Sequence, residues 1–154
     1  MGKGSLKDKE LMEMAIEEAL QASREGEVPV GAVLARGGEV LARDHNRCLC
    51  LNDPTAHAEI LVLRKGAARM GNYRLSGCEL YVTIEPCPMC AGAILNGRIS
   101  RLIFGARDEK AGAVESLYRM LSDYRLNHRV QVTEGVLAER CKEILQSFFQ
   151  ARRG

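Results

Sequence analysis

The second half of the chain alternates short β-prone segments with helical segments, and few folds accommodate that order. Apolar and β-branched residues predict the strands, and apolar residues at helical spacing predict the helices. The segments are residues 78–83 (strand), 88–96 (helix), 101–104 (strand), 113–121 (helix), 130–133 (strand) and 137–148 (helix). A helix between two strands allows them to pair in parallel, with helices covering the sheet on both faces. We therefore expect an α/β fold.

The first half of the chain adds a hairpin between two helices. The segments are residues 8–24 (helix), 28–35 and 39–42 (hairpin strands), 44–54 (irregular) and 55–70 (helix). Asp8 fits the N-cap of the first helix, Gly37-Gly38 fits a tight turn, and Gly71 fits the end of the second helix. With an antiparallel hairpin and parallel later strands, the prediction is a three-layer α/β/α fold with a central mixed five-stranded sheet.

The composition is that of one ordinary globular domain. A chain of 154 residues that is 46% hydrophobic and 27% charged can bury one core but hardly two. We expect a single domain over residues 1–154, with residues 1–7 outside its ordered part. No apolar run in the sequence approaches the roughly 20 residues of a membrane span, and residues 1–5 lack a signal-peptide pattern. The expectation is a cytoplasmic protein without membrane association, whose six cysteines suit metal binding or burial more than disulfides.

Two short segments carry the most chemistry, residues 57–59 (His-Ala-Glu) and 86–90 (Pro-Cys-Pro-Met-Cys). Cysteines at i, i+3 lie on one face of a helical turn and can bind one metal ion. Pro88 fits the first position of a helix, which places Cys87 at the positive end of the helix dipole. His57 lies near the start of its own predicted helix. Two helix starts directed at one point would form a zinc site from His57, Cys87 and Cys90.

The number of ligands distinguishes a catalytic zinc site from a structural one. Structural zinc usually takes four protein ligands, whereas catalytic zinc takes three and leaves a position for water. Glu59, in the first turn of its helix, could face that water and move its protons. A structural site is the alternative, with Cys48 or Cys50 as a fourth ligand. Cys78 and Cys141 are expected to be core residues.

Two further features bear on the substrate. Asn46 ends the second hairpin strand, where its amide could contact an adenine edge or a ribose hydroxyl, or simply be a turn residue. Residues 98–154 carry 11 Lys and Arg against 7 Asp and Glu, whereas residues 1–97 carry 11 against 13. A basic carboxy-terminal third is compatible with a polyanionic partner. Arg152 and Arg153 could reach phosphates or form a solvated tail.

Five segments also carry a resemblance to a known family. They are residues 53–60 (Asp-Pro-Thr-Ala-His-Ala-Glu-Ile), 72–75 (Asn-Tyr-Arg-Leu), 85–93 (Glu-Pro-Cys-Pro-Met-Cys-Ala-Gly-Ala), 104–108 (Phe-Gly-Ala-Arg-Asp) and 127–130 (Asn-His-Arg-Val). The chain resembles the bacterial tRNA-specific adenosine deaminases over roughly residues 8–153. The zinc-ligand segments match a signature that zinc-dependent nucleobase deaminases share. The other three segments are narrower and indicate the adenosine branch.

The resemblance implies a fold, a reaction and partners. Family members have a cytidine-deaminase-like fold, act as homodimers and convert the wobble adenosine of a tRNA anticodon loop to inosine. By this resemblance His57, Cys87 and Cys90 hold one Zn²⁺ per subunit, and Glu59 is the catalytic proton shuttle for hydrolysis at C6 of adenine. By the same resemblance Asn46 contacts the flipped nucleoside, and Arg107 and Asp108 lie beside neighbouring anticodon nucleotides. Independently of the resemblance, Val30 and Ala58 are expected to line the base.

Two other functions remain open at the level of the sequence. A free-base or nucleoside deaminase that acts on guanine or cytosine would share the zinc chemistry and differ in the rim of its pocket. A non-catalytic RNA-binding protein stabilised by zinc would share the metal ligands but would have no use for Glu59. An activity assay on RNA and on free bases separates the first alternative, and substitution of Glu59 separates the second.

Overall fold

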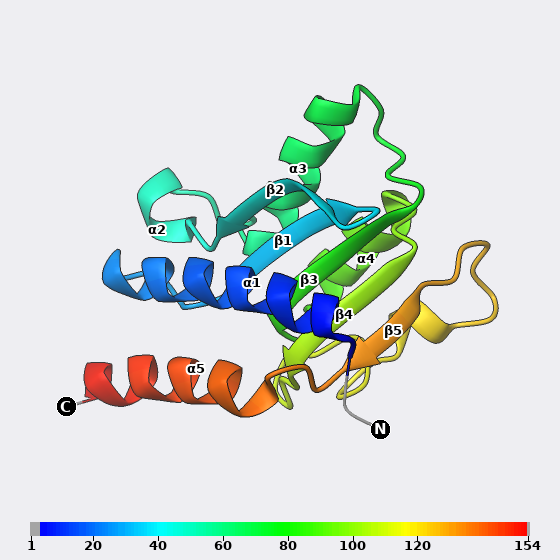
Figure 1. Ribbon diagram of the computed structural model, residues 1–154. Helices are drawn as coiled ribbons and strands as arrows, with labels where there is room; N and C mark the ends of the chain where they lie inside the picture. Colours follow the sequence, from blue (N-terminus) through cyan, green and yellow to red (C-terminus); the bar gives the residue numbers. More distant parts are fainter. Residues whose placement is uncertain (1–3, 154) are drawn as a thin grey trace.

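Five strands form one mixed sheet at the centre of the computed structural model, which describes residues 4–153 (Figure 1). They are β1 (Gly31–Arg36), β2 (Glu39–His45), β3 (Cys78–Ile84), β4 (Arg101–Ala106) and β5 (Gln131–Glu134). The sheet order is β2-β1-β3-β4-β5, with β1 antiparallel to β2 and β3, and with β3, β4 and β5 parallel. The predicted mixed five-stranded sheet is confirmed.

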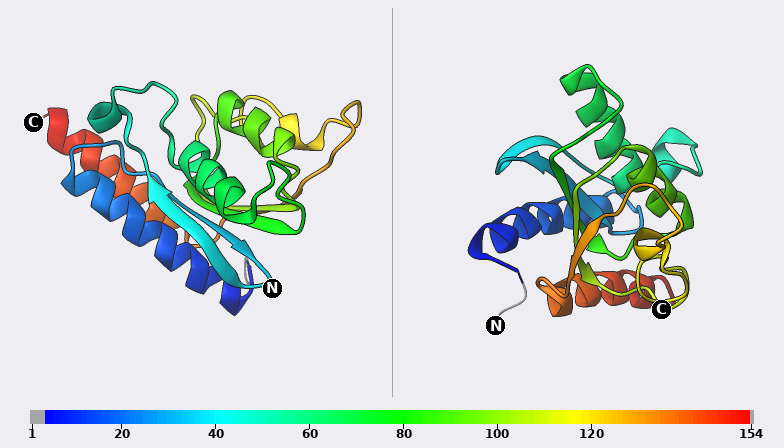
Figure 2. Two further views of the ribbon diagram at one scale, coloured as in Figure 1. Left: turned by 90° about the horizontal axis from the view of Figure 1, so that it is seen from above. Right: turned by 90° about the vertical axis from the view of Figure 1, so that its right-hand side faces the viewer.

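Helices cover both faces of this sheet. They are α1 (Leu6–Arg24), α2 (Cys48–Leu51), α3 (Ala58–Met70), α4 (Pro88–Asn96), the 3₁₀ turn η1 (Met120–Ser122) and α5 (Ala138–Arg153). Helices α1 and α5 lie side by side on one face, whereas α3 and α4 cover the other (Figure 2). The three-layer α/β/α prediction is therefore confirmed.

The sheet separates two apolar clusters because successive side chains of a strand point to opposite faces. In β3, Leu80 and Val82 pack with α3 and α4, whereas Tyr81 between them packs with α1 and α5. In β4, Leu102 and Ile103 divide in the same way. Because both faces are covered, the middle of each of these strands, residues 80–82 and 102–104, is a continuous apolar run.

Helix α1 begins two residues earlier than predicted because Ser5, and not Asp8, is its N-cap. The Ser5 hydroxyl accepts a hydrogen bond from the Asp8 amide, and the Asp8 carboxylate accepts one from the Ser5 amide. Residues 5–7, predicted to lie outside the ordered part, form this cap and the first helical turn. Residues 1–3 of that prediction lie outside the described residues.

Two irregular regions also differ from the sequence prediction. The predicted helix over residues 113–121 is wrong, since this stretch is a series of turns followed by η1. The backbone amides of Val114, Glu115 and Ser116 donate to the carboxylate of Glu85, so they do not form the i to i−4 hydrogen bonds of a helix. The predicted irregular stretch 44–54 contains the end of β2 and the short helix α2. Among residues 4–153, no helix has the length and apolar character to cross a membrane.

Candidate active site

Two helices begin at the same place on the α3/α4 face of the sheet. His57 is the N-cap residue of α3, and Cys87 is the N-cap residue of α4. Pro88 is the first residue of α4, which suits its missing amide hydrogen and places Cys90 one turn later. The Nδ1 atom of His57 lies 3.6 Å from the Cys87 sulfur and 3.4 Å from the Cys90 sulfur. The structure thus brings together the three residues whose spacing predicts a metal site.

These distances fit a tetrahedral metal ion. Zinc lies about 2.0–2.1 Å from an imidazole nitrogen and about 2.3 Å from a thiolate, so tetrahedral angles hold the two ligand atoms about 3.6 Å apart. The three ligand atoms form one of two groups in residues 4–153 whose His, Cys, Asp and Glu side chains are close enough to share an ion. Neither Cys48 nor Cys50 belongs to this group. The structural-zinc alternative therefore has no fourth cysteine ligand within the described residues.

The pKa values of the two cysteines in this group shift in opposite directions. A hydrogen bond from the Cys90 thiol, with a further one from His57, lowers the pKa of Cys87 to about 4 although burial opposes the change. The same Cys87–Cys90 bond, together with burial, raises the pKa of Cys90. The pKa of His57 is raised by its hydrogen bond with Cys87. A lowered pKa favours the thiolate of Cys87, which is the form of cysteine that binds a metal ion.

Glu59 lies in the first turn of α3, two residues after His57. Its side chain is buried, with 4% of the residue exposed, and it interacts with the Cys90 thiol. Burial raises the pKa of Glu59 to about 7, and the attraction of His57 offsets only part of that rise. A carboxyl group in such surroundings exchanges protons near neutral pH, as a general acid and base must.

Asn46 connects the hairpin to the start of α3. Its side-chain oxygen accepts a hydrogen bond of 2.8 Å from the Ala58 backbone amide, and its backbone amide donates to the Val30 carbonyl. Val30 is half-buried at the edge of both apolar clusters, and Ala58 is fully buried. These hydrogen bonds link Asn46 to Val30 and to Ala58, and Ala58 lies between His57 and Glu59 in the chain.

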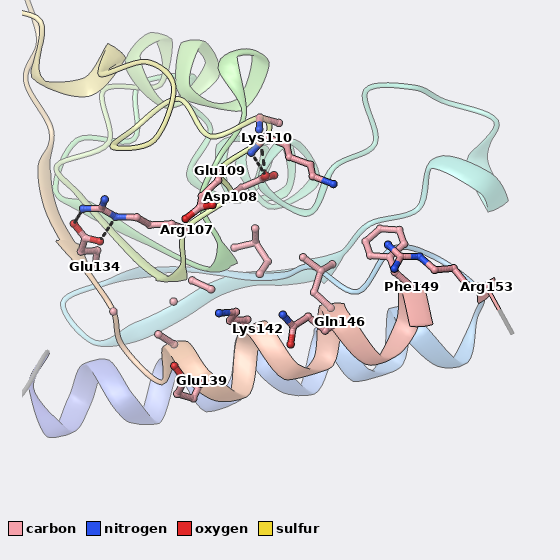
Figure 3. Close-up of a pocket in the computed structure, with 17 residues that line it drawn as sticks. Arg107, Asp108, Glu109, Lys110, Glu134, Glu139, Lys142, Gln146, Phe149 and Arg153 are labelled. Carbon is pink, nitrogen blue, oxygen red and sulfur yellow. Dashed lines mark hydrogen bonds and ion pairs between the residues drawn. The ribbon is translucent and has the colours of Figure 1, made fainter. Parts of the chain in front are cut away.

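Arg107 and Asp108 lie apart from the ligand group, at the start of the loop that follows β4. Arg107 forms an ion pair with Glu134 at 2.8 Å, and the Asp108 carboxylate accepts hydrogen bonds from the amides of Lys110 and Ala111. Both residues line a groove of about 660 Å³ between this loop and α5 (Figure 3). Both cations and anions line the two walls: Arg107, Asp108, Glu109, Lys110, Glu134, Glu139, Lys142 and Arg153.

Arg152, one of the two arginines predicted either to reach phosphates or to form a solvated tail, is held against the protein. Its guanidinium donates to the Gly26 carbonyl and stacks over the ring of Phe148, 4.3 Å from its centroid.

Two polar features of the structure were missed by sequence reasoning. The first is Glu85, a buried carboxylate just before the segment with the two candidate cysteine ligands, and its position directly after strand β3 was the available signal. The second is His45, which is buried with its ring nitrogens bonded to Glu18 at 2.7 Å and Glu25 at 2.9 Å. His45 and Glu18 also belong, with Asp44, to the second group of possible ligands. Arginine and lysine side chains already pair with its carboxylates, so this group fastens α1 to β2.

Comparison with known proteins gives one consistent result. The family model described as MafB19-like deaminase matches residues 6–153. A tRNA-specific adenosine deaminase of Haemophilus influenzae is 51% identical over 95% of this chain and 85% of its own length. The corresponding Bacillus subtilis protein is 45% identical over 95% of this chain and 91% of its own length.

Solved structures agree with the sequence relatives. A structure from studies of A-to-I editing by tRNA:A34 deaminases superposes with a TM-score of 0.86 at 49% identity, covering 88% of this chain and 99% of that one. A guanine deaminase of Bacillus subtilis superposes with a TM-score of 0.62 at 27% identity, covering 95% of this chain and 94% of that one. Both sequence and structure are therefore more similar to the tRNA enzymes than to this free-base enzyme.

Proposed function

Because the chain belongs to the MafB19-like deaminases and, among them, to the tRNA-specific adenosine deaminases, we propose that it converts the wobble adenosine of a tRNA anticodon to inosine. The observation that carries the proposal is the convergence of His57, Cys87 and Cys90 beside the buried carboxyl group of Glu59. Three protein ligands are the number that catalytic zinc uses. A neighbouring carboxyl group can move the protons that hydrolytic deamination requires.

His57, Cys87 and Cys90 would hold one zinc ion in each subunit. When bound there, zinc would act as a Lewis acid and lower the pKa of water to near neutrality. Glu59 accepts a proton from the attacking water and delivers it to the ring nitrogen next to C6 of adenine. It then passes a second proton to the departing amine, so that water and adenosine become inosine and ammonia. The fixed position of Glu59 in the first turn of α3 keeps its carboxylate beside the reacting carbon.

The adenine must leave its stack before C6 can reach such a site, and a single-stranded anticodon loop permits this at low cost. Asn46, Val30 and Ala58 line the position of the base, with the Asn46 side chain held toward α3 by its bond to the Ala58 amide. Arg107 and Asp108 contact the neighbouring nucleotides. The functional unit is a homodimer in the cytoplasm.

An assay with two kinds of substrate tests the proposal. The protein is incubated with an anticodon stem-loop that bears a wobble adenosine and, separately, with free guanine and free cytosine, and its zinc content is measured in the same sample. We expect inosine in the RNA and about one zinc per chain. Release of ammonia only from the free bases would assign the protein to the free-base deaminases.

Substitution of Glu59 tests whether the site is catalytic. Glu59→Ala removes the proton-transferring group and leaves the three metal ligands in place, so zinc content should stay unchanged while inosine formation falls by about 10²-fold or more. Unchanged activity with zinc still bound would contradict catalysis by this route.

A further inference from the structure

The loop after β4, residues 107–119, begins with Arg107 and Asp108, which form one wall of the groove; it is called the β4 loop below. The loop has no helix, but it is held tightly by its own backbone. The Gly112 amide donates to the Asp108 carbonyl, and the Gly112 carbonyl accepts hydrogen bonds from Leu117 and Tyr118. The side chains of Ala113 and Val114 are buried in the apolar cluster on the α3/α4 face. The loop is thus anchored to the core at its middle.

The carboxylate of Glu85 lies at the centre of this loop. One of its oxygens accepts hydrogen bonds from the Asp108 amide, at 3.0 Å, and from the Ser116 hydroxyl. The other accepts three backbone amides, those of Val114 at 3.0 Å, Glu115 at 2.7 Å and Ser116 at 2.9 Å. Glu85 is 3% exposed, so these five bonds from the loop replace its hydration. A single buried side chain therefore joins the start of the β4 loop to its middle.

The loop approaches Glu85 so closely that only glycine fits at one position. A Cβ atom at Gly112 would overlap both the Glu85 carboxyl group and the Asp108 carbonyl oxygen. The fit between loop and carboxylate thus depends on residues from two separate parts of the chain.

Glu85 also adjoins the segment that carries the metal ligands. Its backbone amide donates to the Ala106 carbonyl at 2.8 Å, which pairs the ends of β3 and β4. The carbonyl of the next residue, Pro86, accepts the Ala113 amide at 2.8 Å, and Cys87 follows directly. The β4 loop, which begins with the groove wall, is therefore bonded to the turn that presents Cys87.

We propose that Glu85 is a positioning residue for RNA binding, which sets the Arg107–Asp108 wall of the groove at a fixed distance from the catalytic site through its bonds to the β4 loop. This proposal rests on the proposed function, in which those two residues contact the nucleotides beside the target adenosine. A substrate that spans both places binds well only if the wall and the site keep their separation. Glu85 itself takes no part in the reaction, so its loss should weaken binding and not the chemical step.

Glu85→Gln gives a selective test because an amide can satisfy only part of the loop. The glutamine oxygen can accept the three amides of residues 114–116, while its NH₂ group donates to the Ser116 hydroxyl. The NH₂ group then faces the Asp108 amide, which loses its acceptor. The substitution thus releases the groove wall and keeps the remaining bonds.

The experiment measures KM and kcat for inosine formation in the anticodon stem-loop, its Kd by fluorescence anisotropy, and the zinc content of each variant. For Glu85→Gln we expect KM and Kd to rise by about tenfold or more, with kcat within about twofold and zinc unchanged. Gly112→Ala displaces the same loop without altering Glu85 and should show the same pattern. Ser116→Ala removes one of the five bonds and leaves the Asp108 amide paired, so its effect should be much smaller.

Asp8→Asn is the matched control, because Asp8 is another buried carboxylate with several hydrogen bonds and contacts Tyr81 on the opposite face of the sheet. It should lower stability and leave KM and Kd unchanged. Unchanged KM and Kd in both Glu85→Gln and Gly112→Ala would overturn the proposal. It would also be overturned if Glu85→Gln lost zinc and its kcat fell in proportion. If the unmodified protein binds the stem-loop but forms no inosine, the proposed reaction is wrong, and the Kd values still decide the role of Glu85.

Discussion

The ion pair between Asp8 and Arg101 should make the stability of this protein depend on pH in acid. Asp8 is 2% exposed, and its carboxylate accepts hydrogen bonds from Arg101, the Ser5 amide and the Tyr81 hydroxyl. Burial alone would raise the pKa of Asp8, but these bonds outweigh it and hold the pKa at about 2, below the ordinary 3.8. Because a tenfold difference in proton affinity is worth about 1.4 kcal/mol, the charged form contributes about 2 kcal/mol to the free energy of unfolding.

The sign of the effect follows from the lowered pKa. The unfolded chain binds the proton more readily than the native protein, so the contribution is complete above about pH 5 and is lost as the pH falls through about 4 toward 2. Urea unfolding of the native protein and Asp8→Asn at a series of pH values measures it. The difference in unfolding free energy should be about 2 kcal/mol at pH 7 and should shrink steadily below about pH 4.

A surface pair provides the control for this experiment. Arg125 also holds the pKa of Asp123 at about 2, but this pair is exposed to solvent, which screens its attraction. Asp123→Asn should therefore change the unfolding free energy little at any pH. A difference between the native protein and Asp8→Asn that stays constant from pH 7 to pH 3 would refute the reasoning.

Three other changes have defined expectations. Cys90→Ala should lower the zinc content from about one per chain to near zero, because two ligands do not retain the ion, and a full complement of zinc would contradict the assignment. Asn46→Ala leaves the Ala58 amide without its acceptor and should cost about 1–3 kcal/mol in urea unfolding, whereas an unchanged midpoint would show that water replaces the bond. Gly31→Ala places a Cβ against the backbone of Ala15 and Ala19 in α1. It should lower the free energy of unfolding by about 1–3 kcal/mol and reduce the thermal midpoint. An unchanged midpoint would show that α1 can shift freely.

Local sequence signals were reliable wherever a structure depends on residues a few positions apart. The helix Pro88–Asn96 has the predicted bounds, because Pro88 can begin a helix and small apolar residues continue it. Helix α3 ends at Met70 as predicted, since Gly71 takes the left-handed conformation, with φ of 68°, that closes a helix. The closeness of the Cys87 and Cys90 side chains likewise follows from their i, i+3 spacing in one helical turn.

Errors arose where a distant side chain competed with the local pattern. Residues 113–121 have the periodicity of a helix, yet Glu85, 29 residues before Val114, takes the backbone amides of the stretch and folds it into turns. Asp8 is a good N-cap residue by type, but its carboxylate is needed by Arg101, 93 residues away, while Ser5 caps the helix. These partners meet only after the strands have paired.

The sequence by itself determined the sheet, the positions of most helices and the identity of the candidate metal ligands, because these depend on backbone periodicity and residue chemistry. The tertiary structure alone decided that the starts of α3 and α4 meet. There the His57 Nδ1 atom lies 3.4 Å from the Cys90 sulfur and 3.6 Å from the Cys87 sulfur. The tertiary structure also decided the path of the β4 loop around Glu85. Both depend on hydrogen bonds and packing between segments far apart in the chain, which local propensities do not encode.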